Sequence, residues 1–283
     1  MIEATLCQKN IAQSPSADAQ VQPQILGQLG SLVTRLAINE TEIREALQVR
    51  YTVFCEELNA RTCDLSRSRK IEFDPHDAHF DHLLVIDQSD GNRIVGTQRI
   101  CLQSSANTTR PLYTQNEFDI KNLIARHPDN IFMELGRSCI LPEYRSRRTL
   151  ELMWQGTWAY ARDNLVDIMV GCASFPGTDI DKIAPELAFL ASYMPLTPQW
   201  QVRAKSKNTK AIDVSWKTEI DPKAAIRRLP PLVKGYLRLG AMFSSEVVID
   251  EEFNTTDILV VLRVACINPR YIRHYGEDAE RYR

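Results

Sequence analysis

Apolar residues recur every three or four positions in two segments of this chain, a spacing that places them on one face of a helix. The first segment follows Thr41, which can cap a helix, and extends to Leu58. The second runs through residues 150–161. Both predict amphipathic helices. Arg50 lies on the apolar face of the first, and it requires an acidic partner because an unpaired buried charge is costly.

Shorter apolar or alternating runs predict strands around these helices. The expected strands cover 31–38, 82–87, 93–103, 131–140, 167–173, 246–249 and 259–264. The second and third are joined through 89–92, whose sequence Ser-Asp-Gly-Asn is a strong hairpin signal. Further helices are expected near 119–125, 181–193 and 231–239. The mixed order of strands and helices predicts an α/β fold with a mixed central sheet flanked by helices.

The chain has 283 residues, of which 44% are hydrophobic and 25% charged, as expected of a folded protein. Residues 1–26 are rich in Gln, Ser, Ala and Pro without a period, so we expect a flexible N-terminal arm. Residues 27–270 are expected to form one domain with a C-terminal extension, and 271–283 a polar tail.

The net charge of −2 gives no reason to expect a nucleic-acid partner. Seven scattered cysteines are typical of a reducing compartment, and no pair of histidines completes a metal site with them. We recognise neither a signal peptide nor a membrane-spanning run. The expected location is therefore the cytoplasm, and no bound metal is expected.

The loop before the strand at 82–87 holds Glu72, Asp74 and Asp81 among aromatic residues and histidines. Such carboxylates can act as a general base or bind a cationic group, or they can be solvated acids that cap turns. His76 and Asp81 also have the HxxxxD spacing of glycerolipid acyltransferases. The phosphate-binding block that should follow is missing, so we treat that match as coincidence.

In the strand at 131–140, alternation places Glu134, Gly136 and Ser138 on one face and Arg137 on the other. A glycine within a strand permits a ligand to approach the backbone closely. An acid beside that gap can accept a proton from an amine. The alternative is a structural ion pair between Glu134 and Arg99 on the neighbouring strand.

Arg145, Arg147 and Arg148 precede the second amphipathic helix, where basic side chains and free amides can bind a phosphate, although ordinary surface arginines look the same. Residues 171–179 follow with small side chains that leave room for a thioester, and they contain no Gly-x-Ser-x-Gly elbow. Three lysines could extend the basic patch, namely Lys205, Lys207 and Lys210.

Eight stretches within residues 31–275 carry a family likeness: 50–58, 72–74, 81–83, 95–99, 134–139, 171–175, 229–240 and 253–257. Together they resemble the ornithine–acyl-carrier-protein N-acyltransferases. The resemblance implies the GNAT superfold, a relation to acyl-homoserine-lactone synthases, and transfer of a 3-hydroxyacyl chain to the α-amine of L-ornithine or another amino acid, giving lyso-ornithine lipid.

The resemblance also implies an acyl carrier protein as partner, with 4′-phosphopantetheine delivered by the carrier and no cofactor of the enzyme's own. The usual acyl-CoA loop is degenerate, since residues 145–150 contain no glycine. A single phosphodiester could still be met by Arg145, Arg147 and Arg148, which could also attract an acidic carrier.

The expected mechanism is direct attack of the α-amine on the thioester, with Glu134 or Glu72 as base and backbone amides near Gly136 stabilising the oxyanion. Arg50 and Arg99 could hold the ornithine carboxylate. Asp74 or Asp81 could meet the side-chain ammonium, and apolar residues of the helix at 150–161 and of the C-terminal segment could line the acyl tunnel. The remaining candidates for substrate contact are Arg137 and Ser174.

Two alternatives stay open. A homoserine-lactone synthase would depend on S-adenosylmethionine, and the extension at 229–240 argues against it. A membrane-lytic or lipid-binding protein without catalysis is disfavoured because we recognise neither a signal peptide nor an exposed amphipathic helix. Peripheral contact with the inner membrane face is compatible with a lipid product.

Overall fold

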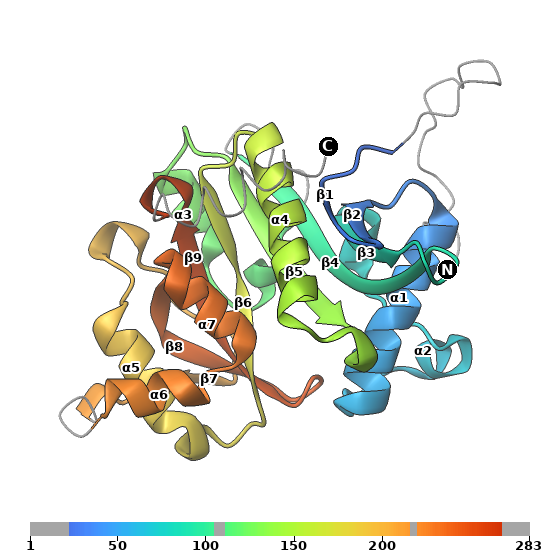
Figure 1. Cartoon of the computed structure of the whole chain (residues 1–283). Coiled ribbons are helices and arrows are strands. Elements are labelled where there is room, and N and C mark those ends of the chain that lie inside the picture. The colour runs from blue at the N-terminus through green and yellow to red at the C-terminus, as the bar shows by residue number, and fades with distance from the viewer. Residues whose placement is uncertain (1–22, 105–110, 216–219, 268–283) are drawn as a thin grey trace.

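The computed structural model describes residues 23–104, 111–215 and 220–267. Its strands form one nine-stranded sheet in the order β1-β2-β3-β4-β5-β6-β9-β8-β7 (Figure 1). β5 and β6 run parallel, and every other neighbouring pair is antiparallel. The predicted mixed sheet is therefore confirmed. The tail predicted at 271–283, and all but the last four residues of the predicted arm, lie outside the described residues.

The strand bounds are β1 Gly27–Leu29, β2 Leu32–Leu36, β3 Asp81–Asp87, β4 Arg93–Gln103, β5 Phe132–Ile140, β6 Ile168–Pro176, β7 Thr209–Ala211, β8 Met242–Asp250 and β9 Thr255–Arg263. The helix bounds are α1 Glu40–Arg50, α2 Asp64–Arg69, α3 Ile120–Arg126, α4 Arg147–Asp163, α5 Ala184–Tyr193, α6 Pro222–Arg228 and α7 Pro231–Leu239. β1, β7, α2 and α6 were not predicted, because each is too short to show a period.

The first predicted helix exists, but its cap differs from the prediction. Asn39, and not Thr41, caps α1, since its side chain accepts a hydrogen bond from the amide of Glu42 at 2.9 Å. After α1 the chain continues without a break as a wider π-helical segment, Tyr51–Glu57. The two pieces together cover the length that the apolar period predicted.

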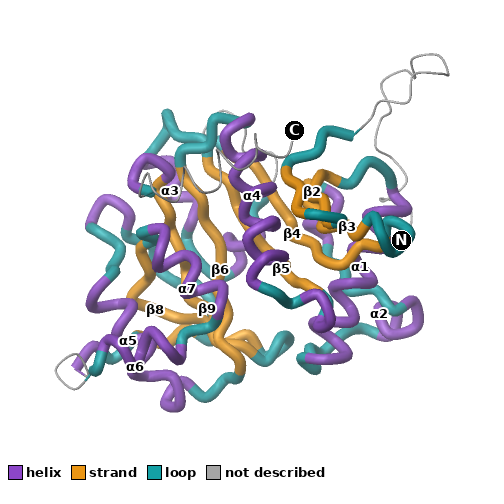
Figure 2. The backbone as a smooth tube through the Cα atoms, in the orientation of Figure 1, coloured by secondary structure: helices purple, strands orange, loops and turns teal. Residues whose placement is uncertain are grey.

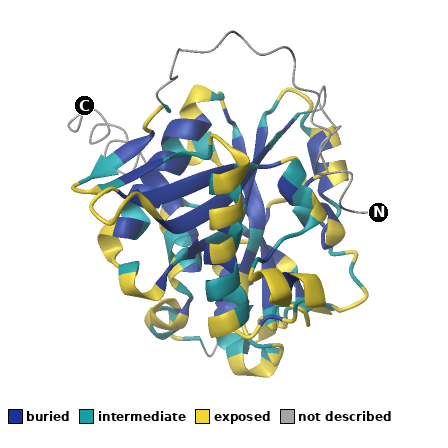
Figure 3. Cartoon of the chain, turned by 90° about the vertical axis from the view of Figure 1, so that its right-hand side faces the viewer, coloured by how far each residue is buried: buried dark blue, intermediate teal, exposed yellow. Residues whose placement is uncertain are grey.

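Helices cover both faces of the sheet (Figure 2). On β4, Gln98 accepts a hydrogen bond from Thr157 of α4 at 2.6 Å, whereas the next residue, Arg99, lies on the α1 side and shares Asp77 with Arg50. α7 packs beside α4, where the rings of Tyr236 and Trp154 meet edge to face at 5.3 Å. Most residues of the strands between these layers are buried, and the exposed residues lie on the outer helix faces and in the loops (Figure 3).

The sheet opens between β5 and β6. The two strands pair over three residues only, ending at Glu134 and Val170, although both continue for several residues more. β5 stays paired with β4 and β6 with β9 beyond that point. At the last contact a side chain on Gly171 would place its Cβ 2.4 Å from the carbonyl oxygen of Leu135, so this position requires glycine. The separation creates a gap in the middle of the sheet.

A β-bulge in β5 changes which side chains face this gap. Gln98 of β4 lies opposite two residues of β5, Arg137 and Ser138, and Arg137 has a φ of 50°. The bulge turns Arg137 to the side of Glu134, and both contact Tyr113. The prediction that Arg137 points away from Glu134 was wrong, because strict alternation does not hold across a bulge.

Among the described residues, no helix is both long enough and apolar enough to cross a lipid bilayer.

Candidate active site

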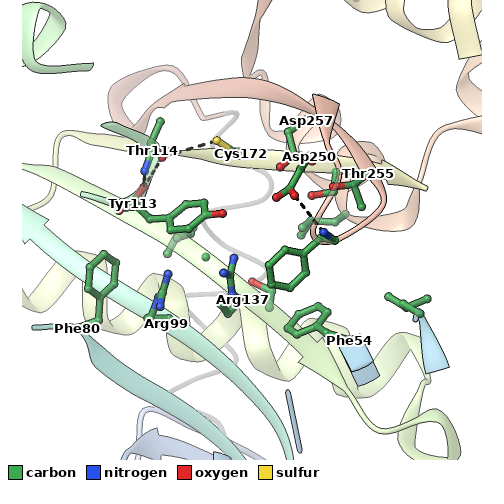
Figure 4. Close-up of a pocket in the computed structure, with 18 of the residues that line it drawn as sticks. Phe54, Phe80, Arg99, Tyr113, Thr114, Arg137, Cys172, Asp250, Thr255 and Asp257 are labelled. Carbon is green, nitrogen blue, oxygen red and sulfur yellow. Dashed lines mark hydrogen bonds between the residues drawn. The ribbon is translucent and has the colours of Figure 1, made fainter. Parts of the chain in front are cut away.

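A cavity of about 220 Å³ lies where β5 and β6 separate (Figure 4). β5 contributes Glu134 through Ser138, and β6 contributes Cys172 and Ser174. The remaining lining residues come from the π-helical segment and its end, the loop before β3, β4, the 3-10 turn Tyr113–Asn116, α7 and the β8–β9 hairpin: Phe54, Leu58, Phe80, Arg99, Tyr113, Thr114, Leu232, Tyr236, Asp250, Phe253, Thr255 and Asp257. Of the predicted site residues, Glu134, Gly136, Arg137, Arg99 and Ser174 therefore meet in one cavity.

One side of the cavity is supported by six interleaved charges, which we call the ion network: Arg50, Glu72, Asp74, Asp77, Arg99 and Arg137. Arg50 is fully buried and lies 2.5 Å from Glu72 and 2.6 Å from Asp77. Its predicted need for an acidic partner is confirmed. The cavity lining does not include Arg50 or Glu72, so the structure places both behind the wall.

Asp77 is the one acid of the ion network that sequence reasoning did not name as a candidate. It bonds Arg50 and also Arg99, at 2.9 Å, and its side chain accepts a hydrogen bond from the amide of Asp74. Burial alone would raise the pKa of Asp77, but the charges of Arg50 and Arg99 outweigh it and hold that pKa well below its usual range. The apolar face of α1 signalled that a partner was needed, but several nearby acids could have filled that role.

Arg99 and Arg137 carry the network into the cavity. Arg99 is 1% exposed and bonds Asp74 at 2.7 Å through one terminal nitrogen, while its Nε and other terminal nitrogen find no hydrogen-bond partner among the described residues. Its guanidinium carbon lies 4.6 Å from the ring centre of Phe80. Arg137 lies between two rings, 4.6 Å from Tyr113 and 4.3 Å from Phe253.

Glu134 is 1% exposed and held by backbone donors. Its Oε2 accepts one bond from the amide of Tyr113 at 2.7 Å, and its Oε1 accepts the amide of Thr114 at 2.6 Å together with that residue's hydroxyl. The alternative ion pair with Arg99 is not formed, because Arg99 bonds Asp74 and Asp77 instead. Burial raises the pKa of Glu134, and the hydrogen bonds from Thr114 and Tyr113 oppose that rise.

On the opposite side of the cavity Asp250 and Asp257 line the wall, and Glu117 lies against them without lining it. We call these three carboxylates the acid cluster. Their ligand-capable atoms lie within 4.8 Å of one another. Burial raises the pKa of Glu117 to about 8, with the charge of Asp257 adding to it, and burial raises the pKa of Asp257 to about 6. Such a group can hold a cation. Sequence reasoning named none of its members as a site residue, although Asp257 ends the family-like stretch 253–257.

Cys172 lies beside this cluster and lines the cavity. Burial raises the pKa of its thiol well above the usual value, and the charges of Glu117 and Asp257 raise it further. The group therefore stays a thiol at neutral pH, which makes it a poor nucleophile.

Two predicted contact residues have different surroundings. Asp81 accepts a hydrogen bond from the hydroxyl of Tyr160 at 2.6 Å and does not line the cavity. Ser174 does line it and pairs with Asp257 across β6 and β9. At Gly136, a Cβ would meet no heavy atom within 4 Å, so the backbone there is open to the cavity.

The three predicted phosphate-binding arginines lie at the start of α4, which Ser146 caps. Arg145 forms a two-pronged ion pair with Glu57, at 2.6 and 2.5 Å, and Arg147 bonds Glu151 at 2.7 Å. Arg148 is exposed. The three lysines that could extend the patch, Lys205, Lys207 and Lys210, lie on or just before β7, the edge strand farthest from β1.

A family model for acetyltransferase (GNAT) domains matches residues 49–155, which confirms the predicted GNAT fold. The chain is 47% identical to the L-ornithine N(alpha)-acyltransferase of Agrobacterium fabrum (strain C58) over 98% of its own length and 96% of that protein. It is 46% identical to the L-ornithine N(alpha)-acyltransferase of Rhizobium meliloti (strain 1021) over 91% and 88% of the two chains.

Among solved structures, FeeM, an N-acyl amino acid synthase from uncultured soil microbes, is similar with 13% identity and a TM-score of 0.42, covering 83% of this chain and 91% of that one. This likeness is too distant to support a comparison of mechanisms.

Proposed function

This chain belongs to the L-ornithine N(alpha)-acyltransferase family, and we propose that it transfers a 3-hydroxyacyl chain from acyl carrier protein to the α-amine of L-ornithine, forming lyso-ornithine lipid. The observation that carries this proposal is the cavity at the opening of the sheet, which brings a buried acid, orphan arginine donors and exposed strand edges together. We place the reaction in the cytoplasm, where a carrier protein would be met.

The thioester is proposed to enter through the gap between β5 and β6. Beyond Glu134 and Val170 the facing edges of these strands have no strand partner in the described part of the chain, so their amides and carbonyls are available to an extended pantetheine arm. Gly136 leaves open space beside the backbone at this edge. A tetrahedral oxyanion formed here could be stabilised by strand amides, each contributing roughly 3 kcal/mol.

The acceptor is proposed to bind with its carboxylate at Arg99, which has two unpartnered donor nitrogens and lines the cavity. Arg50 supports Arg99 from behind through their shared partner Asp77. Because Arg99 is already fixed by Asp74 and Asp77, little side-chain freedom is lost when substrate binds.

Glu134 is the proposed base. It lines the cavity, and its Oε2 accepts only one hydrogen bond, so a lone pair remains for the α-ammonium or for an intervening water. Burial raises its pKa, which makes it a stronger base than an ordinary carboxylate. Glu72 is the weaker candidate, because Arg50 and Arg137 engage both of its oxygens. Direct attack of the amine requires no acyl-enzyme, consistent with the unreactive thiol of Cys172.

Mass spectrometry of the purified protein with 3-hydroxyacyl carrier protein and a panel of amino acids tests the reaction. We expect N-acyl ornithine, and a loss of roughly 100- to 10,000-fold in turnover for Glu134→Gln, the usual range for removing a general base. Glu251→Gln, at an exposed position of the β8–β9 turn, is the matched control and should be unchanged. Product only with S-adenosylmethionine, or vesicle leakage without any product, would refute the proposal.

We further propose that the arginines at the start of α4 receive the carrier. Arg147 and Arg148 are exposed, with Arg147 also paired to Glu151, and Arg145 forms a two-pronged pair with Glu57. The variant Arg147→Glu/Arg148→Glu should raise KM for acyl carrier protein several-fold and weaken its salt dependence, with no effect on a soluble acyl-pantetheine donor. Equal losses with both donors would exclude a docking role.

A further inference from the structure

The acid cluster differs from every other group of buried charges described above, because it has no cation of its own. Among the described residues no lysine or arginine forms an ion pair with Glu117, Asp250 or Asp257. Arg137 lines the same cavity, but its nitrogens bond Glu72 and Asp74 of the ion network. The charge of Arg137 lowers the pKa values of Glu117 and Asp257, but burial outweighs it, so the cluster is an incompletely compensated set of acids beside the cavity.

Two of its oxygens are also left without hydrogen bonds. Glu117 is 6% exposed and Asp257 5% exposed, yet Oε2 of Glu117 and Oδ1 of Asp257 have no hydrogen-bond partner among the described residues. Asp250 is different, since its Oδ1 accepts the amides of Glu252 and Phe253 at 2.8 and 3.0 Å and closes the β8–β9 turn. Buried acceptors without donors are costly, and a bound cationic donor would remove that cost.

The position of the cluster matches one end of a diamino acid. Figure 4 shows Arg99 and Arg137 on one side of the cavity and Asp250 and Asp257 on the other. The two acids first considered for the side-chain ammonium are already engaged: Asp74 by both of those arginines, and Asp81 by Tyr160. A substrate held by its carboxylate at Arg99 would direct its side chain toward the acid cluster, where Asp257 and Glu117 each have an oxygen without a hydrogen-bond donor among the described residues.

Resting on the proposed function, we infer that the acid cluster binds the side-chain ammonium of the acceptor and so selects a diamino acid over a neutral one. Asp257, which lines the cavity, supplies a free acceptor oxygen, Glu117 adds a second one from behind the wall, and Asp250 supplies charge from a fixed position. The cluster would then recognise the amine that is not acylated, while Glu134 serves the amine that is.

The decisive comparison is ornithine against norvaline, which has the same side chain without its amine. Wild-type kcat/KM should favour ornithine by at least about 100-fold, because a site built for a charged donor is left unpaired by norvaline. Asp257→Asn and Glu117→Gln should each lower kcat/KM for ornithine by roughly 10- to 100-fold, the range for a hydrogen bond to a charged group. Their kcat/KM for norvaline should stay within about 3-fold of wild type.

Controls separate recognition from structure and from chemistry. Asp257→Glu keeps the charge and should recover part of the preference, and Glu251→Gln at its exposed position should leave both substrates unchanged. Equal losses for ornithine and norvaline would overturn the inference, since they would indicate a role in proton transfer or in folding. A divalent metal bound stoichiometrically by wild type and lost in Asp257→Asn would also overturn it.

Failure of the proposed function would be seen separately. If wild type makes no N-acyl product from any amino acid, the function fails, and calorimetric titration with ornithine and norvaline decides the inference without turnover. Ornithine binding that exceeds norvaline binding, and that weakens in Asp257→Asn, supports the cluster as an ammonium site. Equal binding of both amino acids refutes it.

Discussion

The ion network and the acid cluster meet at one cavity, yet they solve the problem of buried charge in opposite ways. The network alternates three arginines with three acids, and each of its arginines bonds two of the acids. The cluster gathers three acids, and two of their oxygens have no donor among the described residues. A balanced group holds itself together in the empty protein, whereas an unbalanced one is stabilised by what it binds.

Removing one cation from the balanced group should give the largest effect on stability. In Arg50→Met, Glu72 and Asp77 lose a buried partner, and we expect the free energy of unfolding to fall by about 3–5 kcal/mol. Urea unfolding followed by circular dichroism measures this change. Arg147→Met, which removes an 88% exposed arginine, is the control and should behave as wild type. A small loss in Arg50→Met would mean that the network contributes little to the fold.

The same chemical change should have opposite signs in the two groups. Asp77→Asn leaves Arg50 and Arg99 without a shared carboxylate and should cost about 3 kcal/mol of stability. Asp257→Asn removes a charge that burial disfavours and should increase stability by about 1–3 kcal/mol at pH 8, given a pKa raised by roughly two units. Paired unfolding curves at pH 8 test this contrast, and destabilisation of both variants to a similar degree would contradict it.

The pH dependence of stability should separate the groups as well. Glu117 and Asp257 have raised pKa values of about 8 and about 6, so the folded state binds more protons than the unfolded chain from about pH 4 to 8, and stability falls as pH rises. The pKa of Asp77 is lowered, so its contribution is complete above the ordinary value of 3.8 and is lost as pH falls below it.

Melting temperatures measured from pH 4 to 9 test this expectation. The slope above pH 5 should flatten in Glu117→Gln/Asp257→Asn, because these two of the acids with raised pKa values are then neutral at every pH. Saturating ornithine should flatten the wild-type slope in the same way, since a bound ammonium favours the charged carboxylates. A slope unchanged in the double variant would show that other groups titrate in this range.

The sequence predicted the elements with an unbroken period and missed the places where the period changes. β4 and α7 were predicted at their observed bounds. β8 was predicted only at 246–249, because polar residues at 244–246 interrupt the apolar run where the strand carries a bulge against β9. The bulge in β5 likewise reversed the predicted direction of Arg137. Bulges depend on pairing with a distant strand, and no local pattern reports them.

The balanced group was also more predictable than the unbalanced one. Arg50 on an apolar helix face indicated that a buried acid must pair with it. Glu72 and Asp74, two acids of the ion network, were already named as candidate site residues. For the cluster, the only sequence signal was that Asp257 ends the family-like stretch 253–257, which assigned it no role. Glu117 and Asp250 lie in short polar segments, and they meet Asp257 only because β8 and β9 form a hairpin beside the segment that follows β4. Convergence of this kind depends on tertiary structure.

Asp81 provides the smallest and sharpest contrast, since it is a carboxylate with a partner that is neither an arginine nor a ligand. Its Oδ2 accepts the hydroxyl of Tyr160 at 2.6 Å, and it lies outside the cavity lining. In Asp81→Asn the amide oxygen can still accept that hydrogen bond, so we expect a loss of only about 0.5–1.5 kcal/mol, with the KM for ornithine unchanged. Steady-state kinetics beside thermal unfolding measure both quantities. If ornithine instead bound about tenfold more weakly to this variant, a difference of about 1.4 kcal/mol, Asp81 would belong to the ammonium site. The proposal that the acid cluster binds the side-chain ammonium would then be wrong.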